Sequence, residues 1–173
     1  MPTISDITAI RRTQPSDAEA FAESVASVAR ERKYLATVDG FPLDRARALL
    51  QRIADENLPQ VIALCGDIVV AWCDIVPKTN AGYTHVGTLG MGVLKEWRGT
   101  GIGRKLIGEC LEMARAMGLE KVELTVYADN TAAIRLYESV GFRHEGRRPA
   151  SRKLDGVYQD EILMGLIFIP PAC

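Results

Sequence analysis

Apolar side chains recur at helical spacing in two long segments of the chain. One segment begins near Pro42 and ends at Asn57-Leu58-Pro59, and the other follows a run of closely spaced glycines and ends at Gly118. An apolar residue returns every three or four positions, which gives each segment one apolar helical face. The apolar positions are Leu43, Ala46, Leu49, Leu50 and Ile53 in the first segment and Leu106, Ile107, Cys110, Leu111, Ala114 and Met117 in the second. We therefore predict two amphipathic helices.

Start and stop residues predict two further helices. Pro15-Ser16-Asp17 precedes Ala18–Arg30, and Asp129-Asn130 precedes Thr131–Val140, which Gly141 terminates. Serine, aspartate and asparagine accept hydrogen bonds from the free N–H groups of a first helical turn, and glycine adopts the left-handed conformation that commonly ends a helix.

Other segments carry the shorter period or the β-rich composition of strands. Val122, Leu124 and Val126 alternate with polar residues, and Gly66-Asp67 lies between two β-rich runs as a hairpin turn does. The predicted strands are Ile7–Arg11, Gln60–Cys65, Ile68–Val76, Thr84–Leu94, Lys121–Val126 and Tyr158–Ile169, the last following a second hairpin turn at Leu154–Val157. Gly87, Gly90 and Gly92 interrupt one of these strands, so we expect a bulge there or a close approach by another backbone or a ligand.

The order of these elements predicts a mixed α/β fold. A strand and two helices come first, then antiparallel strands, then alternating strands and helices, and finally a hairpin. One sheet with helices on both faces accommodates that order. A length of 173 residues is typical of one domain, so we predict a single domain over residues 1–173.

Composition and charge narrow the functional classes. The chain is 47% hydrophobic and 25% charged, with a formal net charge of -1 and a pI near 6.1. A nucleic-acid-binding domain usually carries a basic excess, so any polyanion bound here must be met by a local group of cations. No apolar run reaches the ~20 residues of a membrane span, and the first twelve residues lack the apolar core of a signal peptide. We expect a cytoplasmic protein with neither nucleic acid nor membrane as partner.

The cysteines and histidines do not have metal-ligand spacing. The cysteines, including Cys173, form no C-x-x-C pair, and His85 and His144 are far apart in sequence. We predict no metal site. Cys65, Cys73 and Cys110 have apolar neighbours, so we interpret them as small core residues in a reducing compartment.

Three glycines occupy alternate positions between Arg98 and the second amphipathic helix. The segment Gly99–Gly103 lacks the spacing of a P-loop and that of the G-x-G-x-x-G dinucleotide motif. Backbone N–H groups at a helix N-terminus bind anions, and glycines let phosphate oxygens approach them closely. We therefore predict a diphosphate site, with positive charge from Arg98, Arg104 and Lys105.

Two motifs resemble those of the GNAT superfamily of N-acetyltransferases. Arg98-Gly99-Thr100-Gly101-Ile102-Gly103 fits the acetyl-CoA loop [R/Q]-x-x-G-x-[G/A], and the segment from Asn130 to Phe142 fits N-x-x-A-x-x-L-Y-x-x-x-G-F. The resemblance implies a central, mostly antiparallel twisted sheet flanked by helices, with acetyl-CoA as co-substrate. The cofactor-binding residues that it implies are Met91, Gly92, Val93, Arg98, Gly99, Thr100, Gly101, Ile102, Gly103, Arg104, Asn130 and Tyr137.

The resemblance also implies a mechanism in which both substrates are bound at once. The pantetheine arm lies along the fourth strand, a primary amine attacks the thioester directly, and Tyr137 protonates the departing thiolate. On residue chemistry alone, Tyr137 could equally be a buried aromatic residue and Asn130 a helix cap. The base that deprotonates the amine stays open among His85, Asp74 and Glu31, each of which could instead be a solvated or capping residue.

The same resemblance assigns acceptor specificity to the linker between the first two helices and to the terminal hairpin. We predict substrate contacts from Arg30, Glu31 and Arg32, and the cluster that Arg30 and Arg32 form with Lys33 suggests an acceptor carboxylate, although such a cluster could simply be solvated. An amino acid or a similar small amine is the expected acceptor. A polyamine, a protein N-terminus or lysine, and a non-catalytic acyl-CoA sensor are the alternatives. A homodimer is expected by analogy, with the run Ile162–Ile169 either at its interface or in the core.

Overall fold

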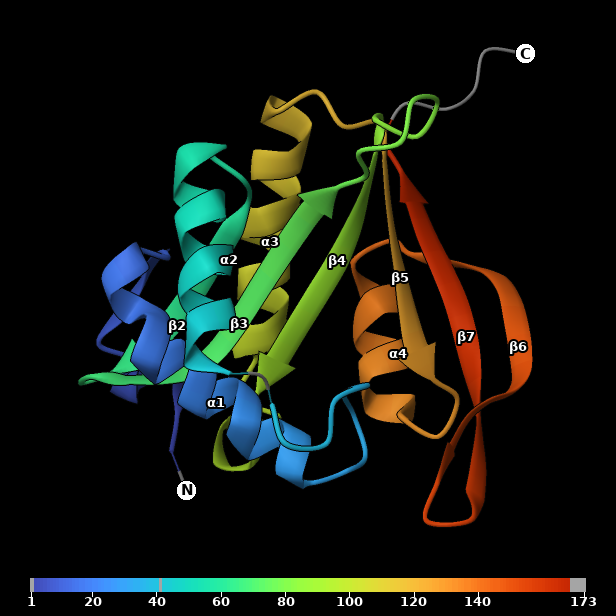
Figure 1. Ribbon diagram of the computed structural model, residues 1–173, viewed down its shortest axis with the longest axis horizontal. Coiled ribbons are helices and arrows are strands. Elements are labelled where there is room, and N and C mark those ends of the chain that lie inside the picture. Colours follow the sequence, from blue (N-terminus) through green and yellow to red (C-terminus); the bar gives the residue numbers. More distant parts are fainter. Residues whose placement is uncertain (1, 41, 169–173) are drawn as a thin grey trace.

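The computed structural model describes residues 2–40 and 42–168, and these form one sheet with helices on both faces (Figure 1). The helices are α1 (Ala18–Arg30), α2 (Leu43–Asp55), α3 (Ile102–Ala116) and α4 (Thr131–Ser139), and short 3-10 turns cover Ile4–Asp6, Pro15–Asp17 and Lys95–Trp97. The strands are β1 (Ala9–Arg12), β2 (Gln60–Cys65), β3 (Ile68–Pro77), β4 (Val86–Val93), β5 (Lys121–Tyr127), β6 (Arg143–Leu154) and β7 (Val157–Ile167). The mixed α/β fold predicted from the sequence is confirmed.

The sheet has the strand order β1-β2-β3-β4-β5-β7-β6. Every neighbouring pair is antiparallel except β4 and β5, which run parallel with α3 as the crossover between them. The predicted hairpin turn joins β6 to β7. Asp155 and Gly156 both have positive φ there, 51° and 82°, as a tight two-residue turn between twisted strands requires. The predicted end of the last strand, Ile169, lies outside the described residues, as do Cys173 and Phe41.

Two apolar clusters hold the helices on opposite faces of the sheet. Phe21 of α1 packs edge-on against Trp72 of β3, at 5.8 Å between ring centroids, in the cluster that α1 and α2 share. On the other face, α3 buries the predicted stripe from Leu106 to Ala114, whereas Met117 follows the helix and is exposed, and α4 packs beside α3 through Tyr137. Cys73 and Cys110 are buried in this second cluster as expected, and Cys65 is half-buried.

The parallel strands β4 and β5 separate after a short paired region. They pair only where Val86–Thr88 lies beside Lys121–Glu123, and Figure 1 shows them diverging toward the end of the sheet that carries α1. The β5-facing edge of residues 89–93 therefore has no strand partner within the described chain. Such an open edge offers backbone donors and acceptors to an extended ligand.

The bulge expected at the β4 glycines is absent, because β3 and β4 keep a continuous register over Ala71–Pro77. The glycines instead make room for side chains. A Cβ at Gly92 would lie 2.2 Å from Cη2 of Trp72, and one at Gly87 would lie 2.6 Å from Cγ2 of Ile75.

In the described chain, no helix has both the length and the apolar character needed to span a bilayer.

Candidate active site

A cavity of about 640 Å³ opens where β4 and β5 separate. Its walls come from the linker between α1 and α2 (residues 31–42), from β4, from the loop before α3, from the end of β5, and from α4 and β7. This volume lies in the range of small-molecule and cofactor sites. The cavity brings together three regions that are distant in sequence: the glycine loop, the second motif and the linker.

The glycine loop enters α3 through two residues in the left-handed region. Gly99 and Gly101 have φ of 78° and 90°, and a Cβ on either would meet no atom within 4 Å, so backbone conformation rather than crowding requires glycine there. Gly103 has a different role, because a Cβ there would lie 3.2 Å from Cδ2 of Leu136 on α4. Since α3 begins at Ile102, the first N–H groups of the helix have no acceptor within it, and Ile102, Gly103 and Arg104 line the cavity. This geometry is suited to a phosphate group.

The side chain of Arg98 points to the linker and not to the front of α3. Its Nη1 donates to Oε2 of Glu31 at 2.8 Å, its Nη2 pairs with the other carboxylate oxygen, and its Nε donates to the carbonyl of Val93 at 3.0 Å. The guanidinium also lies 4.6 Å from the ring centroid of Tyr34. The hydrogen bonds that Arg98 donates to Glu31 raise the pKa of Arg98 above its usual value. The positive charge of Arg98, which we predicted to bind the diphosphate, is thus already paired with Glu31.

Among the other residues predicted for the cofactor, most contribute to the cavity wall. Arg104 lines it, whereas Thr100 and Lys105 do not, and the Thr100 hydroxyl donates to the Trp97 carbonyl at 2.8 Å. The lining also includes Met91, Gly92, Val93, Gly99, Gly101, Ile102, Gly103, Asn130 and Tyr137.

Tyr137 and Asn130 of the second motif both have structural roles, and both also line the cavity. The Asn130 Oδ1 accepts from the backbone N–H of Ala133 at 3.3 Å, which caps α4. Tyr137 is only 7% exposed, packs edge-on against Phe142 and lines the cavity. Burial raises the pKa of Tyr137 well above its usual value, so the phenol stays protonated at neutral pH and can donate a proton.

Asp74 lies directly behind a glycine of the cavity wall. It is paired with Gly90 across β3 and β4, and a Cβ on Gly90 would lie 3.1 Å from Oδ2 of Asp74. The residue keeps some solvent contact, but desolvation of its carboxyl raises the pKa to about 7. Gln60, its partner on β2, acts in the opposite direction but does not cancel this rise, and the Gln60 amide makes no well-oriented hydrogen bond. A carboxyl that titrates near neutrality therefore lies one glycine away from the cavity.

The other two candidate bases, His85 and Glu31, and the basic cluster lie outside the cavity wall. His85 is exposed in the turn before β4, five residues from Gly90, and at about 3.3 Å per strand residue this is roughly 16 Å away. Arg30 pairs with Glu23 at 3.1 Å on the outer surface, and Arg32 pairs with Asp155 at 2.8 Å. His85, Arg30, Glu31, Arg32 and Lys33 are all absent from the cavity wall. Arg30 and Arg32 thus have carboxylate partners outside the cavity, and their contact with an acceptor stays a prediction from the sequence.

Several wall residues were not predicted from the sequence, among them Glu161, Tyr127 and Tyr34. Glu161 of β7 is the one acidic residue among the described residues of the cavity wall. Tyr127 is paired with it across β5 and β7, and Tyr34 comes from the linker. Only the pairing of β5 with β7 brings Glu161 to the cavity, and no local motif marks that pairing.

Comparison with known proteins decides the family. A family model described as "Acetyltransferase (GNAT) family" matches residues 23–142, which span the linker, the glycine loop and the second motif. The chain belongs to this family. The resemblance, the enzyme class and the acetyl-CoA co-substrate predicted from the two motifs are thereby confirmed.

Individual relatives of this GNAT acetyltransferase agree with the assignment. It is 29% identical to the L-amino acid N-acetyltransferase AaaT of Escherichia coli over 119 residues, covering 68% of this chain and 74% of that protein. It is 52% identical to a mycothiol acetyltransferase of Nocardiopsis dassonvillei over 52 residues, which are 30% of this chain and only 16% of that protein. Among solved structures, the acetyltransferase yncA of Salmonella typhimurium, determined with acetyl-CoA, superimposes with a TM-score of 0.88 at 20% identity, covering 95% of this chain and 96% of that one. At 20% identity, the similarity to yncA shows that the two proteins share a fold.

Proposed function

We propose that the protein transfers the acetyl group of acetyl-CoA to the primary amine of an amino acid or a similar small molecule, with both substrates bound at once. One observation carries the proposal. A single cavity extends from the first turn of α3, past Tyr137, to the linker and the end of β5. A donor and an acceptor can therefore meet inside it. The similarity to an L-amino acid N-acetyltransferase supports the choice of acceptor class.

The donor end is the glycine loop. The diphosphate of acetyl-CoA accepts hydrogen bonds from the free N–H groups of the first turn of α3, and Arg104 supplies a nearby cation. The pantetheine arm follows the open edge of residues 89–93 on β4 as an added strand would. These contacts direct the thioester toward Tyr137.

The chemistry then needs a base and an acid. Asp74 accepts a proton from the acceptor ammonium through the gap at Gly90, and the freed amine attacks the thioester carbon. The C–N bond forms and the C–S bond breaks, while Tyr137 donates its proton to the thiolate. The second proton lost by the amine restores the phenol, and Asp74 releases its own proton to solvent.

The linker favours a small acceptor over a peptide. Arg32 is joined to Asp155 by three hydrogen bonds of 2.8 to 3.1 Å, which tie the linker to the tip of the β6–β7 hairpin. A protein N-terminus or lysine side chain on a large substrate requires an open groove between these two elements.

The single domain, the cytoplasmic location and the homodimer stay predictions from the sequence, and sedimentation of the purified chain tests the dimer.

Release of free CoA tests the function. The chain is incubated with acetyl-CoA and, separately, each amino acid, polyamines and short peptides. We expect thiol release with amino acids, and its loss in Tyr137→Phe separates an enzyme from an acyl-CoA sensor. Release only with peptides or only with polyamines overturns the acceptor class.

A further inference from the structure

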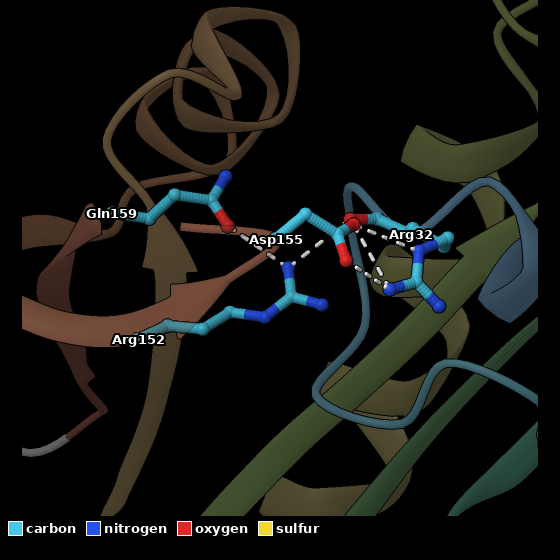
Figure 2. A network of polar contacts seen from close by, with 4 residues as sticks. All are labelled: Arg32, Arg152, Asp155 and Gln159. Atoms are coloured by element: carbon cyan, nitrogen blue, oxygen red, sulfur yellow. Dashed lines mark hydrogen bonds and ion pairs between the residues drawn. The ribbon is translucent and has the colours of Figure 1, made fainter. Parts of the chain in front are cut away.

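We propose that Arg152 binds the carboxylate of the acceptor and thereby selects amino acids over simple amines. The proposal rests on the function proposed above and adds a specificity residue next to the same cavity, behind Tyr127 of its wall. It starts from four residues that join the linker to the terminal hairpin, Arg32, Arg152, Asp155 and Gln159, which we call the clasp (Figure 2).

The clasp holds Arg152 by one end of its guanidinium. Nη1 of Arg152 donates to Oε1 of Gln159 at 2.9 Å and to the backbone carbonyl of Arg32 at 3.3 Å. Gln159 is itself fixed, because its Nε2 donates to Asp129 at 3.1 Å. The guanidinium also lies 4.9 Å from the ring centroid of Tyr127, a favourable cation–π distance. These contacts orient the side chain and leave its other end available.

That other end, Nη2, is buried and has no hydrogen-bond partner in the described parts of the chain. Three carboxylates of the neighbouring elements have other partners: Asp155 pairs with Arg32, Glu161 with Ser151 at 2.8 Å and Arg148 at 3.3 Å, and Asp129 with Gln159. A buried charged donor without an acceptor is costly, and such groups in native proteins are normally paired. A ligand carboxylate is the partner that a guanidinium edge binds best.

Arg152 is not itself part of the cavity wall, but its guanidinium lies against a wall residue at the acceptor end. Tyr127, on which the guanidinium is stacked, lines the cavity together with Leu35 and Ala36 of the linker. Figure 2 shows Nη2 directed away from Gln159, on the side where the linker passes. The bond to the Arg32 carbonyl is long, so the guanidinium can rotate slightly toward a ligand at small cost.

The consequence is a requirement for a carboxylate on the acceptor. A site that hydrogen-bonds a substrate group discriminates strongly against the analogue that lacks it, since its own polar atoms are then left unpaired. We expect the wild-type protein to prefer an amino acid over the corresponding amino-acid amide by about 30-fold or more in kcat/KM.

The test compares these paired acceptors in three variants. Arg152→Gln removes the guanidinium. Asp155→Asn weakens the clasp but keeps Arg152, and Arg148→Gln removes a neighbouring, more exposed arginine of the same strand. Arg152→Gln should lower kcat/KM for the amino acid about 30-fold, mainly through KM, and change that for the amide less than threefold. The two controls should affect both acceptors equally.

Equal losses for amino acid and amide in Arg152→Gln, or a wild-type protein that does not prefer the amino acid, overturn the proposal and leave the acetyltransferase function intact. A binding experiment covers the case of no turnover. N-acetylglycine and N-acetylglycinamide are titrated, with CoA present, into the wild-type protein and into Arg152→Gln. Selective binding of N-acetylglycine that is lost in the variant supports the carboxylate site even if the proposed function fails, and binding that ignores the carboxylate contradicts it.

Discussion

Arg98 and Glu31 form a two-pronged ion pair across 67 residues of sequence, and this pair joins the loop that enters α3 to the linker over the acceptor end of the cavity. Both side chains are partly buried, and Tyr34 lies against the guanidinium. The pair connects the predicted donor and acceptor regions through side chains rather than through the sheet.

Breaking this pair should affect the acceptor more than the donor. Glu31→Gln removes the charge that orients the linker, so we expect the acceptor KM to rise about fivefold while the CoA dissociation constant changes less than twofold. Steady-state kinetics and calorimetry measure the two quantities. Glu23→Gln, which breaks the exposed pair with Arg30, is the matched control and should change neither. An unchanged acceptor KM in Glu31→Gln would show that the pair does not organise the linker.

The left-handed glycine before α3 should be sensitive to a single methyl group. Gly101→Ala forces a Cβ onto a residue with φ of 90°, which costs about 1 kcal/mol of folding free energy, and adds a methyl group to the residue that directly precedes α3. We expect CoA affinity to fall at least about tenfold. Gly108→Ala, inside α3 with open space around it, should stabilise the protein by about 0.5 to 1 kcal/mol and leave CoA binding unchanged. Equal CoA affinity in the two variants contradicts the anion site.

Tyr137→Phe should remove the proton donor and little else. The ring keeps its packing against Phe142, so we expect normal folding and CoA affinity, with kcat lower by about 10² or more. Stopped-flow detection of the released thiol measures the chemical step. A variant with wild-type kcat excludes Tyr137 as the acid.

Asp74 should govern the pH dependence of the reaction. With a pKa of about 7, the carboxyl is protonated below that pH and cannot act as a base, so kcat/KM should rise with pH through this value. In Asp74→Asn this rise of kcat/KM with pH should disappear, and kcat/KM should be about 10²-fold lower than in the wild-type protein. The profile is recorded with an acceptor whose own titration is measured separately. If kcat/KM still rises with pH in the variant, the rise is caused by the titration of another group.

The same carboxyl should make the protein less stable as pH rises. Its pKa is about 7 when folded against 3.8 for an ordinary aspartate, so the folded state keeps a proton that the unfolded state releases. The unfolding free energy therefore falls between about pH 4 and pH 7, by on the order of 3 kcal/mol. Urea denaturation across this range should show the fall in the wild-type protein and not in Asp74→Asn, which should be the more stable of the two at pH 8.

The elements and the donor site could be predicted from the sequence because local patterns determine them. The bounds of α1 and β2 agree with prediction, and the glycine loop and Tyr137 belong to contiguous motifs. The acceptor end could not be predicted in the same way. Glu161 reaches the cavity through strand register.

Side-chain pairing limited the prediction in a second way. Arg32 looked available in the sequence, yet it pairs with Asp155, which comes 123 residues later. The open end of Arg152 likewise depends on where Gln159 and Tyr127 lie in the folded chain.

The central claim is that one cavity holds acetyl-CoA with its diphosphate at the front of α3 and its thioester beside Tyr137. The most direct test is a crystal structure of the protein with CoA. The account predicts diphosphate oxygens within hydrogen-bonding distance of the backbone N–H groups between Gly99 and Arg104, and the CoA sulfur next to the Tyr137 hydroxyl. A diphosphate bound elsewhere, or a sulfur remote from Tyr137, would contradict it.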